Sequence, residues 1–303
     1  METFGSWVAS VTPFDERGQV DPGALRALVE FHVANGTNTL FFMGSTGEVN
    51  MLTEEERRLI VRETVKAAAG RIKIWCGATF PTTEKTVAFA QYAESEGADG
   101  LVFAAPAYTM PNQEMLKEFS RAAISSVKIP CGLYLNPART GVMLEVASLK
   151  ELKAACDNLV VIKEGHANVR HLEEVAFTLG DKVAVCGVDA LSCSNAMASL
   201  TVGGRGLNNA VGNVLPRETA VWAKPWETMD DVLASRNMYE KLYPVLKALN
   251  SVVAPVCFKA AMRLYGLPVG GVRGPLQDLT GEPLKALEKT LEDFGAFDTY
   301  GRA

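Results

Sequence analysis

The feature of this sequence that most limits its fold is the regular alternation of short apolar runs with longer segments of helical period. Parallel strands that are buried on both faces read as continuous apolar runs, and each needs a crossover helix to reach the next strand. The runs lie at residues 6–14, 37–43, 72–79, 100–107, 130–136, 159–165, 183–189 and 204–208. Eight strand–helix units in succession predict an α/β fold, a closed (β/α)8 TIM barrel, over its rival, an open doubly wound sheet.

The spacers carry helix signals, and the end of the chain differs from the rest. Thr53 and Glu56 form a capping-box pattern at the start of one spacer. After Pro216 the strand-like runs stop, and the remaining segments read as helices only. The sequence therefore predicts a catalytic (β/α)8 barrel at residues 1–216. A C-terminal helical region at 217–303 is predicted to pack on the barrel or on a neighbouring subunit.

Charge and hydropathy exclude several classes of partner. The net charge of −5 leaves no basic surface for nucleic acid. No apolar run approaches the ~18 residues of a membrane span, so no membrane partner is expected. The N-terminus has an acidic Glu2 and no basic segment, which is unlike a signal peptide. Six cysteines without a CxxC pair predict reduced, mostly buried thiols and a cytoplasmic protein.

Metal and cofactor motifs are missing from the sequence. His166 and His171 lack the spacing of a ligand pair, so no metal site is predicted. The GGRG segment at 203–206 lacks the third glycine of a dinucleotide fingerprint, and no P-loop occurs. The expectation is an enzyme or binding protein that uses no cofactor.

A lysine ends the sixth apolar run, in "NLVVIKEG". Lys163 either lies at a wet strand edge without a role or is held partly buried for its amine. Catalytic residues of TIM barrels lie at the carboxyl ends of strands, and the opposite rim serves stability. Lys73 and Lys128 come at strand starts, whereas Lys163 comes at a strand end. Because burial favours a neutral, nucleophilic amine, a Schiff base with a keto or aldehyde substrate is the natural hypothesis.

Other predicted strand ends supply polar groups. The loop GSTGE at 44–48 has small residues and hydroxyls suited to a carboxylate, although a plain glycine turn would look the same. Tyr134 suits general acid–base catalysis, and Arg139 suits bidentate binding of a carboxylate. Taken singly, a core tyrosine and a surface arginine are the better interpretations. Asp189 ends the seventh run.

Taken together and in order, these segments resemble the dihydrodipicolinate synthase / N-acetylneuraminate lyase family. The resemblance covers nearly the whole chain and is carried by VTPFDERGQVD, GSTGE, YLNPARTG, IKEG, GGRGLNNAVGNVLP and PVCFKAAMRLYGLPVGGVRGPL. It implies a TIM barrel with C-terminal helices, assembled as a homotetramer of two tight dimers. It also implies a Schiff base between a lysine and pyruvate, or another 2-oxo acid, followed by bond making or breaking at the adjacent carbon.

The resemblance also implies roles for individual residues. Lys163 matches the Schiff-base lysine, and Ser45 and Thr46 match the hydroxyl residues that hold the carboxylate of the 2-oxo acid. Tyr134 matches the tyrosine that shuttles protons. Thr46 and Tyr108 match its partners in a hydroxyl relay, with Tyr108 reaching in from the neighbouring subunit of the tight dimer.

Further matches concern the second carbonyl substrate. Arg139 matches the arginine that binds the carboxylate of aspartate semialdehyde in the synthase branch. Gly187, Asp189 and Asn208 complete the predicted substrate-binding set. Ala190 stands where sialic-acid lyases carry an acidic residue, which argues against a sialic-acid substrate.

Departures from the family pattern keep a second reaction open. Asn208-Asn209 replaces an apolar residue followed by serine, and the amides suit a polar substrate. The pattern for feedback inhibition by lysine is absent at the four matching positions, Glu54, Pro81, Lys85 and Ala107.

The leading prediction is condensation of pyruvate with aspartate semialdehyde. The alternative is a catabolic aldolase, dehydratase or deaminase for 2-oxo acids from sugar-acid or hydroxyproline breakdown. A non-catalytic 2-oxo-acid sensor is the alternative of another class.

Overall fold

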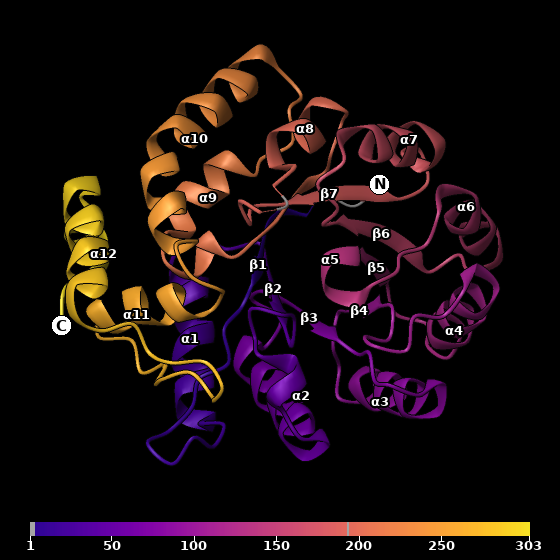
Figure 1. The fold of residues 1–303 in the computed structure, drawn as a ribbon, viewed down its shortest axis with the longest axis horizontal. Helices are drawn as coiled ribbons and strands as arrows, with labels where there is room; N and C mark the ends of the chain where they lie inside the picture. The colour runs from indigo at the N-terminus through magenta and orange to yellow at the C-terminus, as the bar shows by residue number, and fades with distance from the viewer. Residues whose placement is uncertain (1–3, 193) are drawn as a thin grey trace.

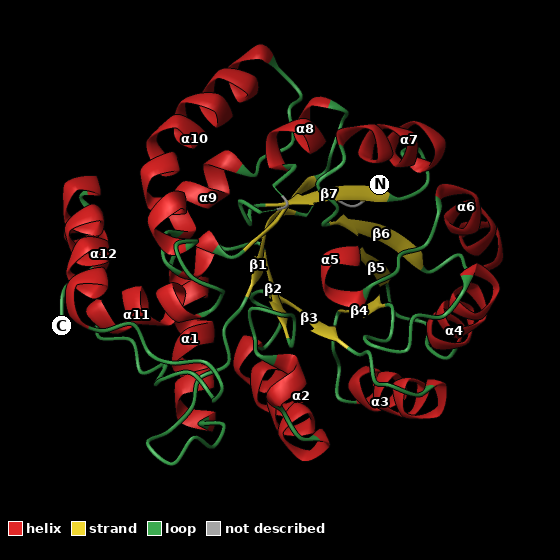
Figure 2. Cartoon of the chain, viewed as in Figure 1, coloured by secondary structure: helices red, strands yellow, loops and turns green. Residues whose placement is uncertain are grey.

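Eight parallel strands close into a barrel in the computed structural model, which describes residues 4–192 and 194–303 (Figures 1 and 2). Each strand pairs with its neighbour in sequence, and β1 pairs with β8. The strands are β1 (Gly5–Ala9), β2 (Thr39–Phe42), β3 (Lys73–Gly77), β4 (Gly100–Ala104), β5 (Cys131–Leu135), β6 (Leu159–Glu164), β7 (Ala184–Val188) and β8 (Gly206–Asn209). The predicted TIM barrel is confirmed, and the open sheet is excluded.

Helices follow the strands and surround the barrel (Figure 2). Those between strands are α1 (Pro22–Ala34), α2 (Glu54–Ala68), α3 (Thr83–Ser95), α4 (Gln113–Ser125), the short α5 (Pro137–Thr140), α6 (Val146–Ala155), α7 (Val169–Leu179) and α8 (Ala196–Thr201). The capping box that opens α2 is confirmed, because Thr53 and Glu56 exchange side chain–backbone hydrogen bonds. Short 3₁₀ helices lie at η1 (Val49–Met51) and η2 (Val211–Asn213).

The strand period separates two cores. Residues inside the barrel alternate along each strand with residues that face the helices. The inner cluster consists of Phe4, Trp7, Ala9, Phe41, Trp75, Val102, Val161, Ala184 and Cys186. On β6, Val161 belongs to this inner cluster and Ile162 to the large outer core. The next residue, Lys163, therefore faces the barrel interior, and Glu164 faces outward.

The chain after β8 is helical, as predicted. Its helices are α9 (Pro216–Trp222), α10 (Met229–Leu249), α11 (Val256–Leu264), α12 (Gly281–Phe294) and α13 (Ala296–Tyr300). Helix α9 packs against β1 and α10, and α11 contacts η2, so this region lies against one side of the barrel (Figure 1). The division at 216/217 stays a prediction, because α9 straddles it and contacts both parts.

A buried ion pair joins the C-terminal helices to the loop after β2. Lys259 Nζ on α11 lies 2.8 Å from Glu48 Oε1, and both side chains are almost fully buried. Burial lowers the pKa of Lys259 to about 8, against the opposing effect of Glu48. Because Glu48 follows directly on the GSTG loop, α11 anchors a segment that borders the candidate site.

No helix within the described residues combines the length and the apolar character that a bilayer crossing requires. The cysteines of the described part of the chain, Cys76, Cys131, Cys156, Cys186 and Cys257, are buried free thiols, as predicted. Cys193 lies outside the described residues.

Candidate active site

A cavity of about 280 Å³ lies where the carboxyl ends of the strands converge. Parallel strands bring their carboxyl ends to one rim of a TIM barrel, so residues far apart in sequence meet there. Seven predicted site residues line this cavity: Ser45, Thr46, Tyr134, Arg139, Lys163, Asp189 and Asn208. The structure therefore brings together most of the predicted set, although their roles in binding and catalysis stay predictions.

Lys163 is buried in this cavity and lies against aromatic rings. The residue is only 4 % exposed, so Lys163 does not lie at a solvated strand edge. Its Nζ lies 3.9 Å from the centroid of the Tyr134 ring and 4.8 Å from that of Phe41. Tyr134 and Lys163 are paired across β5 and β6, so the sheet register fixes this approach. A compound bonded to the Lys163 amine would therefore lie next to the Tyr134 ring.

The Tyr134 hydroxyl has a partner that the sequence did not reveal. Asn136, two residues later, donates a hydrogen bond from its Nδ2 to the phenol oxygen at 2.6 Å. Its backbone carbonyl accepts hydrogen bonds from the N–H groups of Arg139 and Thr140 at the start of α5. Asn136 thus contacts the Tyr134 phenol through its side chain and the turn that carries Arg139 through its backbone. The only sequence signal was its place in the YLNPARTG segment.

Gly165 makes room for the phenol ring. A Cβ at this position would lie 2.7 Å from Tyr134 Cε2 and 3.1 Å from the Leu135 carbonyl oxygen. A side chain there would displace the ring from the Lys163 amine. The glycine of the IKEG segment is therefore explained by packing against Tyr134.

Asp189 lines the same cavity as Lys163 and is buried. Its Oδ2 accepts hydrogen bonds from the backbone N–H groups of Ala210 and Val211, each at 2.8 Å. Burial raises the pKa of the Asp189 carboxyl, against the opposing effects of these hydrogen bonds and of nearby Lys163. The carboxyl ties the end of β7 to the segment after β8 and borders the reactive amine.

The two adjacent asparagines face opposite ways. Asn208 pairs with Trp7 of the inner cluster, lines the cavity, and has a buried Nδ2 without a hydrogen-bond partner among the described residues. Asn209 faces outward, where its amide donates to Ser6 Oγ and accepts from the Gly212 N–H. The expectation that both amides suit a polar substrate is thus corrected: Asn209 is used by the fold, and Asn208 alone offers a donor to a ligand.

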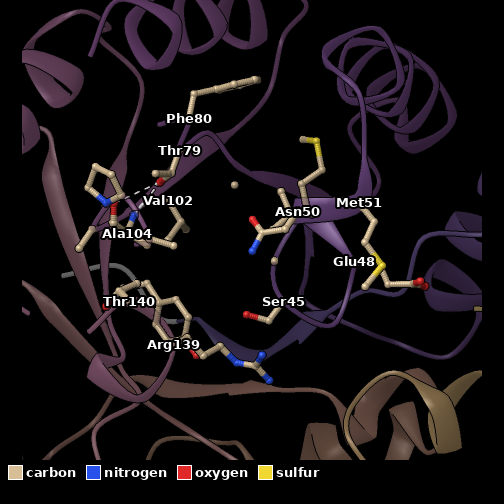
Figure 3. A pocket seen from close by; sticks show the side chains of 18 of the residues that line it. Ser45, Glu48, Asn50, Met51, Thr79, Phe80, Val102, Ala104, Arg139 and Thr140 are labelled. Carbon is tan, nitrogen blue, oxygen red and sulfur yellow. Dashed lines mark hydrogen bonds between the residues drawn. The ribbon is translucent and has the colours of Figure 1, made fainter. Parts of the chain in front are cut away.

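A second cavity of about 770 Å³ adjoins the first (Figure 3). Ser45, Tyr134 and Arg139 line both cavities, whereas Thr46 lines only the smaller one. Figure 3 shows the side chains of Ser45 and Arg139 on one side of this space, with Thr79 and Phe80 across from Asn50. A compound in the larger cavity would contact Arg139, whereas Lys163 lines only the smaller one. The Arg139 side chain is exposed, as the surface-arginine interpretation also required.

Tyr108 is not brought to this site by its own chain. The residue is 99 % exposed, lines neither cavity and adopts a positive φ of 74°. Met110, in the same loop after β4, also has a positive φ, of 47°. Such backbone conformations are uncommon for residues other than glycine and need support from their surroundings. Action within one chain is therefore excluded by this geometry, and action on a neighbouring subunit stays a prediction.

Gly187 lies outside the cavity. It pairs with Glu164 and Leu207, whose side chains face the helices. A Cβ at this position would lie 2.5 Å from Ser199 Oγ, so the glycine makes room for α8. Gly187 can contact a substrate only through its backbone.

The C-terminal region supplies part of the wall, which sequence reasoning missed. Asn250, Ala254 and Phe258, from the end of α10 to α11, line the smaller cavity. The helical period of these segments showed that they fold as helices but gave no sign of which barrel face they cover. The site is thus closed by both parts of the chain.

This arrangement suits reaction of an amine with a carbonyl compound. A nucleophilic nitrogen, a phenol for proton transfer and hydroxyl groups for a carboxylate lie around one small buried space. The described residues hold one group of potential metal ligands, which lines neither cavity: Glu164, His166 and His171.

Known proteins match this chain over almost its full length. The model of the dihydrodipicolinate synthetase family matches residues 2–294. The 4-hydroxy-tetrahydrodipicolinate synthase of Acetivibrio thermocellus is 32% identical, with 96% of this chain and 97% of that protein covered. The crystal structure of dihydrodipicolinate synthase from Aquifex aeolicus is 33% identical with a TM-score of 0.90, covering 96% of this chain and 98% of that one. A monomeric dihydrodipicolinate synthase variant is 29% identical with a TM-score of 0.88, covering 96% and 97%.

Proposed function

The chain belongs to the dihydrodipicolinate synthetase family, and from this premise we propose that it condenses pyruvate with aspartate semialdehyde. It is a lyase of the class I aldolase type, and the reaction is that of a 4-hydroxy-tetrahydrodipicolinate synthase. The observation that carries the proposal is the buried Lys163 amine, 3.9 Å from the ring centroid of Tyr134 in a cavity lined by Ser45 and Thr46.

The chemistry follows from these neighbours. The neutral amine of Lys163 adds to the ketone carbon of pyruvate, and loss of water gives an imine. Removal of a proton from the methyl carbon then gives an enamine, which attacks the aldehyde carbon of the second substrate and becomes an imine again. The amino group of the semialdehyde then displaces the Lys163 amine from this imine, which closes the ring and frees the lysine. Each step moves a proton to or from an oxygen, nitrogen or carbon close to the Tyr134 hydroxyl. Ser45 and Thr46 would hold the pyruvate carboxylate, and Arg139 the carboxylate of the semialdehyde.

Turnover tests the proposal directly. Purified protein is mixed with pyruvate and aspartate semialdehyde, and the cyclic product is followed by coupling to a reductase that consumes it. Pyruvate-dependent product formation that is lost in Lys163→Ala supports the condensation. Absence of product, with the protein shown to be folded, overturns it.

A second candidate rests on Asn208. Its unpartnered Nδ2 in the cavity suits a substrate with an additional hydroxyl or carbonyl near the Schiff-base carbon. That feature favours a catabolic aldolase, dehydratase or deaminase acting on 2-oxo acids from sugar-acid or hydroxyproline breakdown. Turnover of such a 2-oxo acid without a semialdehyde would establish this reaction. A non-catalytic 2-oxo-acid sensor is disfavoured because a binder has no need of the amine–phenol pair.

The assembly belongs to the same proposal. A homotetramer made of two tight dimers would bury the exposed Tyr108 and Met110, which are 99 % and 62 % exposed in the single chain. One matched dihydrodipicolinate synthase variant is monomeric, so the subunit number of this chain has to be measured. We also propose a cytoplasmic location, which the buried free thiols support.

A further inference from the structure

A buried cluster of two histidines and a glutamate lies on the opposite face of β6 from the Lys163 amine. Glu164 is fully buried, His171 in the first turn of α7 is 8 % exposed, and His166 in the connecting loop is half-buried. One potential ligand atom from each residue lies within 4.8 Å of the other two. The spacing of the two histidines in the sequence gave no sign of this cluster. Its third member, Glu164, is the outward-facing residue at the end of β6.

The hydrogen bonds within the cluster leave two ring nitrogens unused. Glu164 accepts from the backbone N–H of His166 at 2.8 Å, and its other oxygen lies 3.1 Å from His171 Nδ1. His166 Nδ1 and His171 Nε2 are buried and have no hydrogen-bond partner among the described residues. A buried polar atom without a partner costs free energy, so the unpartnered His166 Nδ1 beside the Glu164–His171 pair points to a ligand shared by the three residues.

We propose that Glu164, His166 and His171 bind one zinc ion. Two imidazole nitrogens and a carboxylate oxygen form a donor set that zinc prefers, and a water molecule completes a tetrahedral site. Ligands at ~2.1 Å from a tetrahedral ion lie ~3.4 Å apart. Glu164 Oε2 and His171 Nδ1 are already 3.1 Å apart, so the ion would replace the hydrogen bond between them, and His166 has to move in by up to ~1.4 Å from the 4.8 Å limit. Rotation of the half-buried His166 ring supplies that movement.

The ion would join the end of β6 to the start of α7. Glu164 is the last residue of the strand, His171 lies in the first turn of the helix, and His166 lies in the loop between them. The cluster lines neither cavity, so the proposed ion has no contact with substrate. Its role is to hold the loop that begins at Gly165, the residue that packs against Tyr134.

Metal binding to the whole chain tests this site without reference to turnover. Tag-free protein is stripped with a chelator and dialysed, and Co²⁺ is added as a coloured probe. The expected result is one ion per chain, visible absorption typical of a tetrahedral Co²⁺ site, and displacement by one equivalent of Zn²⁺. A chain that takes up no Co²⁺ or Zn²⁺ at micromolar concentration overturns the proposal.

Two histidine variants and one control locate the ion. His166→Ala and His166→Gln remove a half-buried ligand with little risk to folding, and each is expected to weaken binding at least ~10–100-fold. Glu173→Gln removes an exposed carboxylate on α7 outside the cluster and is expected to bind as the unmodified chain does. Equal binding by the unmodified chain and both His166 variants overturns the assignment. The readout is metal affinity, so failure of this proposal leaves the proposed reaction untouched.

Discussion

Asn136 Nδ2 donates a 2.6 Å hydrogen bond to the phenol oxygen of Tyr134, whose ring lies against the Lys163 amine. The donor stabilises negative charge on the oxygen, so it helps a phenol that has to give up its proton and take it back. A phenol of ordinary pKa, ~10, is a poor proton carrier at neutral pH without such help. The amide is a positioning group for the residue expected to move protons.

Replacement of Asn136 by Ala is therefore expected to lower kcat more than it changes the KM for pyruvate. Acid–base assistance is worth ~10²–10⁴ in rate, and loss of one supporting hydrogen bond should cost a part of that. The test is a double-mutant cycle that combines Asn136→Ala with Tyr134→Phe. In the Tyr134→Phe background the Asn136 substitution should have little further effect on kcat, because the phenol is already absent. Independent, multiplying effects would contradict the positioning role.

Trapping with borohydride should identify the reactive lysine. Pyruvate followed by borohydride is expected to inactivate the enzyme and to leave one reduced pyruvate adduct on Lys163, because reduction converts the imine into a stable amine. Mass spectrometry of peptides locates the adduct. Lys259 is a suitable internal control, since it is also buried but lies in an ion pair with Glu48. An adduct on Lys259, or equal labelling of Lys163→Ala, would be incompatible with the mechanism.

Adjacent asparagines allow a matched comparison of binding and stability. Asn208→Leu removes a buried amide nitrogen that has no partner among the described residues, so the thermal midpoint should hold or rise while the KM for the 2-oxo acid rises. Asn209→Leu removes hydrogen bonds to Ser6 and Gly212, so it should lower stability by about 1–3 kcal/mol. Thermal unfolding and steady-state kinetics separate the two effects. A stability loss in Asn208→Leu with an unchanged KM would reverse the assignment.

Arg139→Ala should weaken the second substrate much more than pyruvate. The arginine lines both cavities and is exposed, so the expected loss is about 1.5–3 kcal/mol, the range for a hydrogen bond to a charged group. Arg139→Lys keeps the charge and should recover part of the loss, but not the bidentate geometry. Separate KM values for the two substrates provide the measurement. A larger rise for pyruvate would show that the two carboxylates are assigned the wrong way round.

Tyr108 is expected to act on a neighbouring subunit, because its own chain leaves it 99 % exposed and away from both cavities. Lys163→Ala and Tyr108→Phe should each be poorly active. Mixed under conditions in which subunits exchange, they should regain activity, since a hybrid dimer holds one complete site. The gain should be readily measured, because general acid–base assistance is worth ~10²–10⁴ in rate. Exchange without recovery would mean that Tyr108 only packs an interface.

Much of this architecture could be predicted from local sequence patterns. The strands lie within or next to the predicted apolar runs, because burial on both faces leaves a clear compositional signal. Lys163, Tyr134, Asp189 and Asn208 could be placed at one rim because strand ends share that rim in a barrel. The period of two along β6 then decides that Lys163 faces inward.

What the sequence did not reveal depends on contacts between distant segments. Which of Asn208 and Asn209 faces the cavity depends on the register of β8 against β1. The wall residue Phe258 depends on where the C-terminal helices pack. The meeting of Glu164 with His171 depends on the path of one loop. Hydropathy and motif spacing carry no information on any of these, because each is set by tertiary packing.

Because the barrel closes through β1 and β8, closure has to wait until the last strand has been synthesised. Asn209 donates to Ser6 Oγ across 203 residues of sequence, so β1 leaves the ribosome long before its partner exists. At synthesis rates of ~5–20 residues per second, the first strand waits about 10–40 seconds for the last. During that interval one edge of β1 has unpaired N–H and C=O groups that any other extended chain can bind. The time needed for translation, and not only the strength of the closed barrel, thus sets how long each new molecule is exposed to aggregation.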